Sequence, residues 1–526
     1  MEYPDTSARR GKGSGGGPAP GGARALGWAA ALAGALLVLL ATARYGPGIS
    51  PDSTIYLSVA HSLAEGRGFR QFTGEPMVRW APAYPAVLAP AAAAGLDLPA
   101  AARRLNAALF AALVLGAGAW IRRHVPDARL GAIALAAVVL SPALLRVSVY
   151  VWSEPLFLLL ALLCILDLES FAREGRRGAL VRAALWAGAA TLTRYAGVSL
   201  VAPGLWVVLA RRRDPPARRR LDAGLFAGVA LAPFAAWLVR NWLVAGSPVG
   251  ERAVSSYSLL ASLSLGLEQL SRWLLPPVVA APARVALAVA VLTAGAWALA
   301  RRGAGTREEG AGSAPPWPLA PVAVWMAAYG VLVVAWTSIS AVEQLNERYL
   351  TPLYLPLVVL GARALVERTR ARRRALSAGL ATALMLLGLA YPTARTALHL
   401  RGYLQEGVDG YGTPAWRQSE LARLLRAHPQ AQPLFSNAPD AAYFLADVPA
   451  KFSPRRTFYN SPQRAERDLA RARESVERAP GKRAYLAWFT AAERPFLYSV
   501  ADLESVFTVR VETTASDGAL YVLESR

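Results

Sequence analysis

The stretch RALGWAAALAGALLVLLATARYGPGISPDSTIYLSVAHSLAEGRGF, residues 24–69, joins two segments of different character. The first, residues 24–43, is almost purely apolar and matches the roughly 20 residues that a helix needs to cross a bilayer. The second opens on Pro51-Asp52-Ser53 and continues as a helical pattern. A carboxylate therefore follows directly on a membrane span, and its chemistry depends on the side of the membrane that it faces.

The composition indicates a polytopic membrane protein. Of the 526 residues, 54% are hydrophobic, and they form long Ala/Leu/Val runs broken by arginine clusters. The net charge of +22 does not indicate nucleic acid, because residues 393–526 hold 18 Lys and Arg against 15 Asp and Glu. Most of the excess lies in short loops between the apolar runs, where the positive-inside rule expects it. With Cys164 as the single cysteine, the chain can form neither an internal disulfide nor a cysteine-based metal site.

Eleven apolar runs predict eleven spans, the shorter of which take in flanking residues. They cover residues 24–43, 104–121, 129–147, 155–168, 179–193, 196–210, 221–239, 277–300, 317–337, 351–366 and 375–392. Alternating them places the arginine-rich turns on one side, which is then the cytoplasmic side and holds the N-terminus. The first run also fits a signal peptide, because Ala41-Thr42-Ala43 resembles a cleavage site, but its length favours an uncleaved anchor.

Three domains follow from this topology. Residues 1–22 are rich in Gly and Pro and are expected to form a disordered cytoplasmic tail. Residues 23–392 form a transmembrane domain whose first outer loop, 44–103, contains the opening motif and a Pro-punctuated interfacial helix at 83–97. Residues 393–526 are expected to be a soluble extracytoplasmic α/β domain, with a helix at 463–478 and strands at 484–489 and 505–512. The expected fold class is mainly α, a helical bundle in the plasma (inner) membrane.

Two acidic residues at predicted outer helix starts are candidates for chemistry. Asp52 stands just outside a span, where a partly desolvated carboxylate can accept a proton from a hydroxyl. Its alternative role is an N-cap of the helix that follows. Glu154, in Ser153-Glu154-Pro155, lies between two spans and has the same alternative, since Pro155 suits a first helical turn.

Arginines near the outer surface are candidates for holding a phosphate. Arg194 breaks an apolar run near membrane depth, where an unpaired charge is costly, and its guanidinium could bind a phosphate bidentately. The alternative is a structural ion pair with Asp52 or Glu154. Arg240 and Arg348 supply further outer cations. The remaining candidates for substrate binding are Tyr56, Arg79, Trp80, Tyr84, Tyr195 and Tyr349, although Trp80 and Tyr84 also fit an interfacial aromatic belt.

The order of these motifs resembles a known family. Asp52 opens D-x-x-x-Y-x-x-x-A-x-x-L-x-x-G-x-G-F, and the motifs that follow are W-x-P-x-Y-P (from Trp80), SEPLF (from Ser153), LTRYAG (from Leu192), RNWLVAGSP (from Arg240) and ERYLTP (from Glu347). Over residues 25–392 the chain resembles the multi-span glycosyltransferases of the C-type (GT-C) fold. It is most similar to the bacterial relatives of protein O-mannosyltransferases and lipid A aminoarabinose transferases.

The resemblance implies a polyprenyl-phosphate-linked sugar donor and a glycan, lipid or protein acceptor, with inverting transfer on the extracytoplasmic side. It assigns Asp52 as the catalytic base and Arg194, Arg240 and Arg348 to the lipid phosphate. Mannosyltransferases of the group often carry a paired Asp-Glu, whereas Ser53 follows Asp52 here. This departure argues against protein O-mannosylation and leaves the need for a divalent metal open. A lipid-linked glycan polymerase or ligase, a flippase and a non-catalytic assembly protein are the alternative functions.

Overall fold

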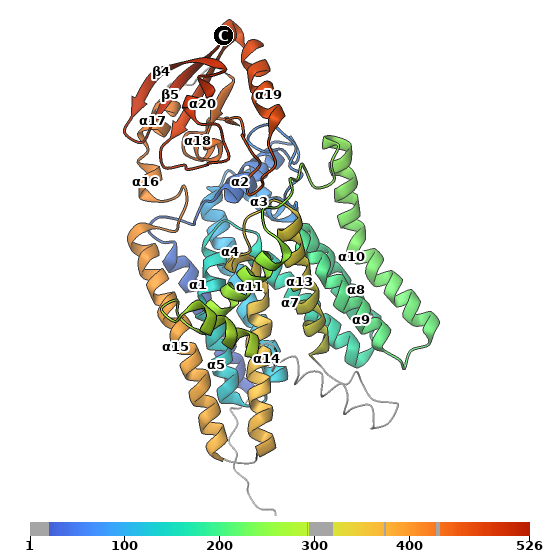
Figure 1. Cartoon of the computed structure of the whole chain (residues 1–526). Helices are drawn as coiled ribbons and strands as arrows, with labels where there is room; N and C mark the ends of the chain where they lie inside the picture. The colour runs from blue at the N-terminus through green and yellow to red at the C-terminus, as the bar shows by residue number, and fades with distance from the viewer. Residues whose placement is uncertain (1–19, 292, 294–318, 373–374, 428–431) are drawn as a thin grey trace, which may run out of the picture.

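The computed structural model describes residues 20–291, 293, 319–372, 375–427 and 432–526. A body of long helices carries a small α/β domain at one end (Figure 1). The helices of the body are α1 (Pro20–Ala41), α2 (Pro51–Ala64), α3 (Ala83–Ala93), α4 (Leu98–His124), α5 (Ala128–Val139), α6 (Pro142–Val149), α7 (Glu154–Glu174), α8 (Arg177–Thr193), the 3₁₀ helix η1 (Tyr195–Leu200), α9 (Val201–Ala210), α10 (Pro216–Ala245), α11 (Leu259–Leu274), α13 (Ala320–Ile339), α14 (Glu347–Arg372) and α15 (Ala375–Glu406).

Within the described residues, seven helical segments are long and apolar enough to cross a membrane. They are Arg24–Ala41, Leu98–His124, Ala128–Val149, Glu154–Glu174, Pro216–Ala245, Ala320–Ile339 and Glu347–Thr369. The predicted membrane bundle is thereby confirmed, while the count of eleven spans stays a prediction. The expected span 277–300 lies partly outside the described residues, which include a shorter apolar helix at Ala281–Val291.

Several predicted boundaries move in the structure. Helix α1 begins at Pro20, so the last residues of the expected tail, 20–22, belong to a helix. The rest of that tail, residues 1–19, lies outside the described ranges. The run 129–147 is two helices, because Ser141 caps α6 just before Pro142. Helix α15 continues to Glu406, past the predicted end of its span at residue 392. These differences arise where a cap or a polar extension, rather than hydropathy, sets the helix end.

The arginine-rich turns gather at the ends of helices that are remote from the candidate residues. Helix α7 runs from Glu154 to Glu174, and its far end meets the α9–α10 turn, where Arg211 Nη1 donates to the carbonyl of Phe171 at 2.9 Å. Arg177 pairs with Asp222 at 2.8 Å in the same region. The helices therefore alternate as predicted here. Which end faces the cytoplasm stays a prediction.

Large side chains fill the centre of the bundle between α4 and α7. Phe110, Trp120, Phe157 and Phe171 are all less than 2% exposed. Burying such a side chain contributes on the order of 1.5–3 kcal/mol, so this core fixes the helix ends on which the candidate site stands.

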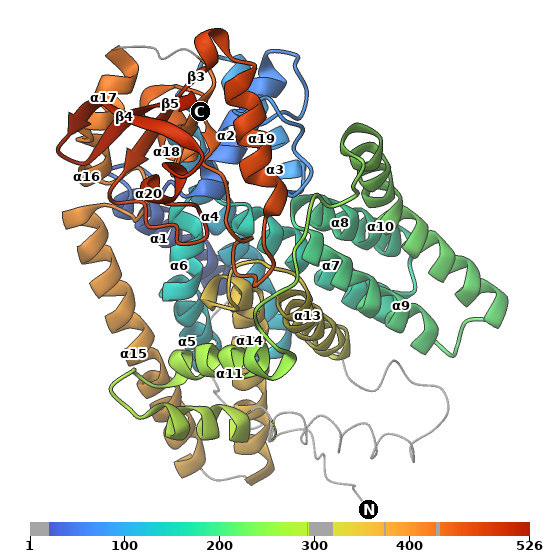
Figure 2. The same ribbon diagram turned by 45° about the horizontal axis from the view of Figure 1, so that its top comes forward.

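Helices α2 and α3 of the first outer segment lie between the bundle and the C-terminal domain (Figure 2). They confirm the helical prediction for the opening motif and for the segment after residue 83. Tyr84 packs edge to face against Tyr56, with ring centroids 5.2 Å apart, and is fully buried. The segment is therefore part of the folded core and not a loose loop.

The C-terminal domain has a five-stranded mixed sheet in the order β2-β1-β3-β5-β4. Its strands are β1 (Leu434–Ser436), β2 (Lys451–Phe452), β3 (Arg483–Phe489), β4 (Phe507–Ala515) and β5 (Gly518–Ser525). Its helices are α16 (Pro414–Arg417), α17 (Glu420–Ala427), α18 (Pro439–Ala446), α19 (Glu466–Glu477), η2 (Pro480–Lys482) and α20 (Val500–Leu503). The predicted α/β mixture, both predicted strands and the predicted helix are present.

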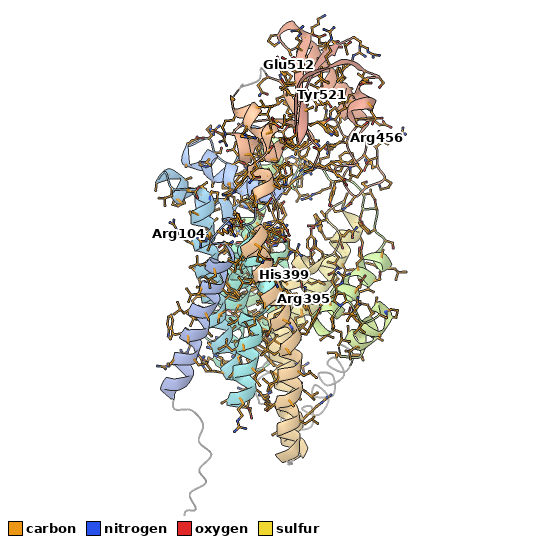
Figure 3. All side chains as sticks on the ribbon, turned by 90° about the vertical axis from the view of Figure 1, so that its left-hand side faces the viewer. Arg104, Arg395, His399, Arg456, Glu512 and Tyr521 are labelled. Atoms are coloured by element: carbon orange, nitrogen blue, oxygen red, sulfur yellow. The ribbon has the colours of Figure 1, made fainter. Side chains whose placement is uncertain are left out.

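Specific contacts join this domain to the first outer segment. The backbone N–H of Tyr411 donates to the carbonyl of Ile49 at 2.8 Å. Gly410 has φ +97°, and a Cβ there would lie 2.0 Å from that carbonyl oxygen, so only glycine allows this approach. In Figure 3, Arg456, Glu512 and Tyr521 mark the domain at one end of the molecule, while Arg395 and His399 lie along α15. The domain is thus held over the end of the bundle from which α2 emerges.

Candidate active site

Asp52 is the second residue of α2 and does not cap that helix. Ser50 is the N-cap: its Oγ accepts from the N–H of Ser53, and Ser53 Oγ accepts from the N–H of Ser50 at 3.0 Å. Trp152 fixes the cap further, because its Nε1 donates to Ser50 Oγ at 2.8 Å. The capping alternative for Asp52 is therefore wrong, and its carboxylate is available for other contacts.

Two donors hold the Asp52 carboxylate. Trp80 Nε1 donates to Oδ1 at 2.9 Å, and Arg348 Nη1 lies 2.7 Å from Oδ2. The side chain keeps 29% of its surface exposed, so a substrate can still reach it. Burial by itself raises the pKa of Asp52, but the charge of Arg348, the two hydrogen bonds and the charge of Arg194 together lower the pKa below its ordinary value. Asp52 is therefore an ionised acceptor at neutral pH.

Glu154 is the buried centre of the same cluster. It begins α7 and is 1% exposed, and its Oε1 accepts from Arg194 Nη1 at 2.6 Å and from Arg348 Nε. Its carboxylate does not cap α7, so that alternative is also wrong. Its other oxygen, Oε2, is buried without a hydrogen-bond partner within the described part of the chain. A buried acceptor without a partner would be satisfied by a donor from a water or a bound molecule.

Arg194 and Arg348 reach the cluster from the ends of two different helices. Arg194 is the residue at which α8 ends in an extended conformation before η1, as predicted for this turn. Arg348 is the second residue of α14, and its guanidinium lies 3.9 Å from the centre of the Trp152 ring. The structure thus brings Asp52, Glu154, Arg194 and Arg348 together. It also shows the ion pair to Glu154 that was the alternative role for Arg194.

Other predicted residues position the site rather than enter its charge cluster. Arg240 donates to the carbonyls of Met77 at 2.8 Å and Phe69 at 3.3 Å, and Tyr195 OH donates to Val78 O at 2.9 Å. These bonds hold the segment that leads into Trp80. Arg240 therefore does not join the cluster, and its assignment to the lipid phosphate stays a prediction that this geometry does not favour.

The other three predicted tyrosines, Tyr56, Tyr84 and Tyr349, differ in what they contact. Tyr56 OH lies 3.3 Å from Ser153 Oγ, beside Glu154. Tyr84 OH donates to Asn106 Oδ1 at 3.1 Å in the core, so Tyr84 is structural. Tyr349 follows Arg348 and accepts through its carbonyl from Tyr329 OH at 2.8 Å. Tyr56 and Tyr349 therefore remain candidates for contact with substrate.

Sequence reasoning missed Glu343. It lies in the loop between α13 and α14, and the described residues provide it with no hydrogen bond or ion pair. Burial raises the pKa of Glu343, opposed by the charge of Arg348 and assisted by that of Asp52, so the loop carries it close to the cluster. The only signal in the sequence for this location is that Glu343 lies five residues before Arg348.

A metal centre would need converging ligands. In the ranges that the structure describes, no three or more His, Cys, Asp or Glu side chains come together as a metal site. The carboxylates of Asp52 and Glu154 are instead bridged by Arg348. The cluster is therefore built from alternating carboxylates and guanidiniums.

Comparison with known proteins identifies the fold. No family model matches the chain, and no curated protein is significantly similar to it in sequence. Among solved structures, ArnT from Cupriavidus metallidurans bound to undecaprenyl phosphate is similar with a TM-score of 0.58 and 14% identity, over 96% of this chain and 98% of its own. The apo state of ArnT gives a TM-score of 0.56 over 93% and 96% of the two chains.

A second enzyme has a similar fold. Arabinofuranosyltransferase AftD from Mycobacteria has a TM-score of 0.52 and 18% identity, over 96% of this chain and 40% of AftD. ArnT and AftD are GT-C glycosyltransferases. The chain has the GT-C fold. The fold predicted from the order of the sequence motifs is thereby confirmed.

Proposed function

We propose that this protein is an integral membrane glycosyltransferase that transfers a sugar from a polyprenyl-phosphate donor to an acceptor hydroxyl. The observation that carries the proposal is the convergence of Asp52, Glu154, Arg194 and Arg348 at the end of the bundle beneath the C-terminal domain. The solved ArnT structure with undecaprenyl phosphate supports a donor of this lipid class, since that protein shares the fold.

The geometry supports an inverting displacement with Asp52 as the base. The acceptor oxygen attacks the anomeric carbon, its proton passes to the Asp52 carboxylate, and the bond from that carbon to the phosphate oxygen breaks. Trp80 and Arg348 orient the base, and the open Oε2 of Glu154 offers an acceptor for a sugar hydroxyl. The acceptor molecule itself is a glycan, lipid or protein of the cell envelope.

The proposed topology places this chemistry on the extracytoplasmic side of the plasma membrane. The arginine-rich turns would lie on the cytoplasmic side with the N-terminus, and the C-terminal domain would lie outside. Because a lipid-linked donor is presented from the membrane, the site needs no cytoplasmic nucleotide. Labelling single cysteines in the α7–α8 turn and in the C-terminal domain with an impermeant reagent on intact cells tests this arrangement.

The direct test is a transfer assay in proteoliposomes. The purified chain is mixed with a radiolabelled polyprenyl-phosphate sugar and an envelope extract, and the extract is then searched for a labelled product. The acceptor class is identified by comparing glycolipids and glycoproteins from cells with and without the gene. Labelled acceptor supports the proposal, whereas movement of the lipid across the vesicle membrane without any transfer would identify a flippase instead.

A further inference from the structure

A hairpin of the C-terminal domain contacts two loops of the helical bundle. Residues 457–464 form this hairpin, which an antiparallel bridge between its first and last residues closes. At its tip, Asn460 adopts a positive φ of 50°, a conformation that Asn tolerates better than most residues. Asn460 Nδ2 donates to the carbonyl of Val342 at 3.0 Å, and its own carbonyl accepts from the N–H of Ser256 at 3.0 Å. One residue therefore joins the domain to the loop before α11 and to the loop before α14.

The two bundle loops are also joined to each other. Val254 pairs with Ser340 in an antiparallel β-bridge, and the side-chain amide of Gln344 donates to Tyr257 OH. Glu343 stands directly between Gln344 and the carbonyl that the hairpin holds. Its backbone is therefore fixed on both sides, by the bundle and by the C-terminal domain.

The hairpin places an aromatic ring beside this carboxylate. Tyr459, which precedes Asn460, packs edge to face against Phe496, with ring centroids 5.5 Å apart, and remains 47% exposed. Burial and then the charge of Glu343 raise the pKa of Tyr459, and Tyr257 raises it further. The rings of Tyr459 and Tyr257 and the carboxylate of Glu343 therefore lie near one another, on loops of two different domains.

Glu343 also lies within electrostatic reach of the proposed base. Burial raises the pKa of Glu343, the charge of Arg348 lowers it, and the charge of Asp52 raises it. Within the ranges that the structure describes, no side chain pairs with the Glu343 carboxylate or donates a hydrogen bond to it. An open carboxylate therefore stands between the two tyrosine rings and the Asp52 cluster.

These groups suit a sugar ring. An ionised carboxylate is only an acceptor, so it takes hydrogen bonds from hydroxyl or ammonium groups and repels phosphate. The face of an aromatic ring carries negative partial charge and attracts the C–H groups of a sugar. Small-molecule sites commonly combine such apolar faces with a few polar groups. The chemistry therefore selects an uncharged sugar or an amino sugar and disfavours an anionic one.

We propose that Tyr459, Tyr257 and Glu343 bind a sugar ring of the acceptor, which is therefore a glycan. The inference rests on the proposed function, because the bound glycan offers one of its hydroxyls to Asp52. In this arrangement the aromatic faces fix the plane of the ring, and Glu343 accepts from a second hydroxyl. The C-terminal domain then selects the acceptor, since Tyr459 belongs to its hairpin.

Saturation-transfer NMR on the full chain in detergent tests this site. The probes are two pools of lipid-free envelope glycans, a neutral and basic pool and an acidic pool, separated on an anion exchanger. The variants are Tyr459→Ala, Tyr459→Leu, Tyr459→Phe and Glu343→Gln. The control is Glu512→Gln, which alters an exposed carboxylate of β4 at the end of the molecule (Figure 3). Thermal unfolding confirms that each variant is folded, and Tyr459→Leu keeps apolar volume without an aromatic face should Tyr459→Ala fail this check.

We expect the neutral and basic pool to bind more tightly than the acidic pool. Tyr459→Ala and Tyr459→Leu should each weaken its binding about threefold to tenfold, the size of one aromatic contact, and Tyr459→Phe should retain it. Glu343→Gln should weaken it about tenfold or more, because hydrogen bonds to a charged group are stronger than those to an amide. In the transfer assay, Tyr459→Leu and Glu343→Gln should raise the KM for the glycan more than they lower kcat, and Glu512→Gln should change neither.

The outcomes separate this site from the proposed function. Glycan binding that is unchanged in Tyr459→Leu and Glu343→Gln overturns the site, even where the protein transfers sugar. Tighter binding of the acidic pool, or no binding of either pool by the wild-type chain, overturns it as well. If neutral glycans bind in a way that depends on both residues but no sugar is ever transferred, the proposed function fails while the site stands.

Discussion

Arg348 joins the two carboxylates of the site: its Nη1 lies 2.7 Å from Asp52 Oδ2, and its Nε donates to Glu154 Oε1. The three residues come from α14, α2 and α7. One guanidinium therefore sets the distance between the partly exposed carboxylate of Asp52, which we propose as the base, and the buried carboxylate of Glu154. This bridge is the geometric feature on which the predicted chemistry depends.

Replacing Arg348 should disable the site. Arg348→Ala leaves Glu154, which is 1% exposed, with Arg194 alone and removes the charged partner of Asp52. Losing one partner of a buried pair costs about 3–5 kcal/mol, so both stability and transfer should fall. Arg348→Lys keeps the charge but cannot span both carboxylates, and we expect transfer to fall by about 10²-fold or more while the fold is kept. Wild-type transfer rates in the lysine variant would contradict the bridge.

The pH dependence of transfer should reflect the lowered pKa of Asp52. Because a carboxyl with a lowered pKa stays ionised into acid, the wild-type protein should remain active as the pH falls through the ordinary Asp range. The stability contributed by this carboxylate is present above its unfolded-state pKa and is lost as the pH falls through the folded pKa. Arg348→Gln removes the positive charge that lowers the pKa of Asp52, so that the effect of burial, which raises this pKa, predominates. The acid limb of kcat/KM should therefore move to higher pH in this variant.

Glu343→Gln is the control for this pH profile. Glu343 has a raised pKa and could produce an acid limb of its own. A limb that persists in Glu343→Gln and moves in Arg348→Gln belongs to Asp52. If instead the limb is lost in Glu343→Gln and unmoved in Arg348→Gln, our assignment of the base is wrong.

Trp80→Phe should slow transfer without unfolding the protein. The change removes the Nε1 donor to Asp52 Oδ1 and keeps an aromatic ring in its apolar surroundings. A hydrogen bond to a charged group is worth about 1.5–3 kcal/mol, so we expect kcat to fall roughly tenfold or more. Trp416→Phe is the matched control in the C-terminal domain. Equal kinetics for the two variants would show that Trp80 only fills space.

The stability of the C-terminal domain should depend on Arg494. Its Nη2 binds both oxygens of Asp440, at 2.9 and 3.0 Å, and reaches Tyr411 OH at 3.2 Å, next to the contact with Ile49. Since Asp440 is 2% exposed, Arg494→Ala should cost about 3–5 kcal/mol in thermal unfolding of the full chain. Arg483→Ala, which removes an exposed arginine paired with Glu524 at the surface, should cost no more than about 1 kcal/mol. Equal losses of unfolding free energy in the two variants would mean that the buried pair stabilises the chain no more than the surface pair does.

The helices and their polar ends were predictable because hydropathy and arginine-rich turns set the alternation of the chain. That alternation is enough to bring Asp52, Glu154, Arg194 and Arg348 to one end. The pair of Arg194 with Glu154 was among the alternatives that the sequence offered, but the bridge that Arg348 makes between Asp52 and Glu154 was not predictable, because it depends on side-chain reach across three helix ends. Ser50 takes the capping role through its reciprocal bonds with Ser53, and Trp152, 102 residues further along the chain, also donates to its Oγ.

Residues in irregular loops were the ones that sequence reasoning missed. Glu343 has no periodic neighbours, and its place near the site follows from the fold of the loop between α13 and α14. Strands β1 and β2 have three and two residues, too few for an alternating pattern to be recognised.

The measurement that tests the account most directly is sugar transfer by Asp52→Asn in proteoliposomes, beside Asp97→Asn, which alters the exposed cap of α4 and lies outside the cluster. Removing a general base typically costs 10²–10⁴-fold in rate. We predict a loss of about that size for Asp52→Asn, with normal membrane insertion and normal polyprenyl-phosphate binding, and little change for Asp97→Asn. Transfer by Asp52→Asn at close to the wild-type rate would contradict the proposed mechanism.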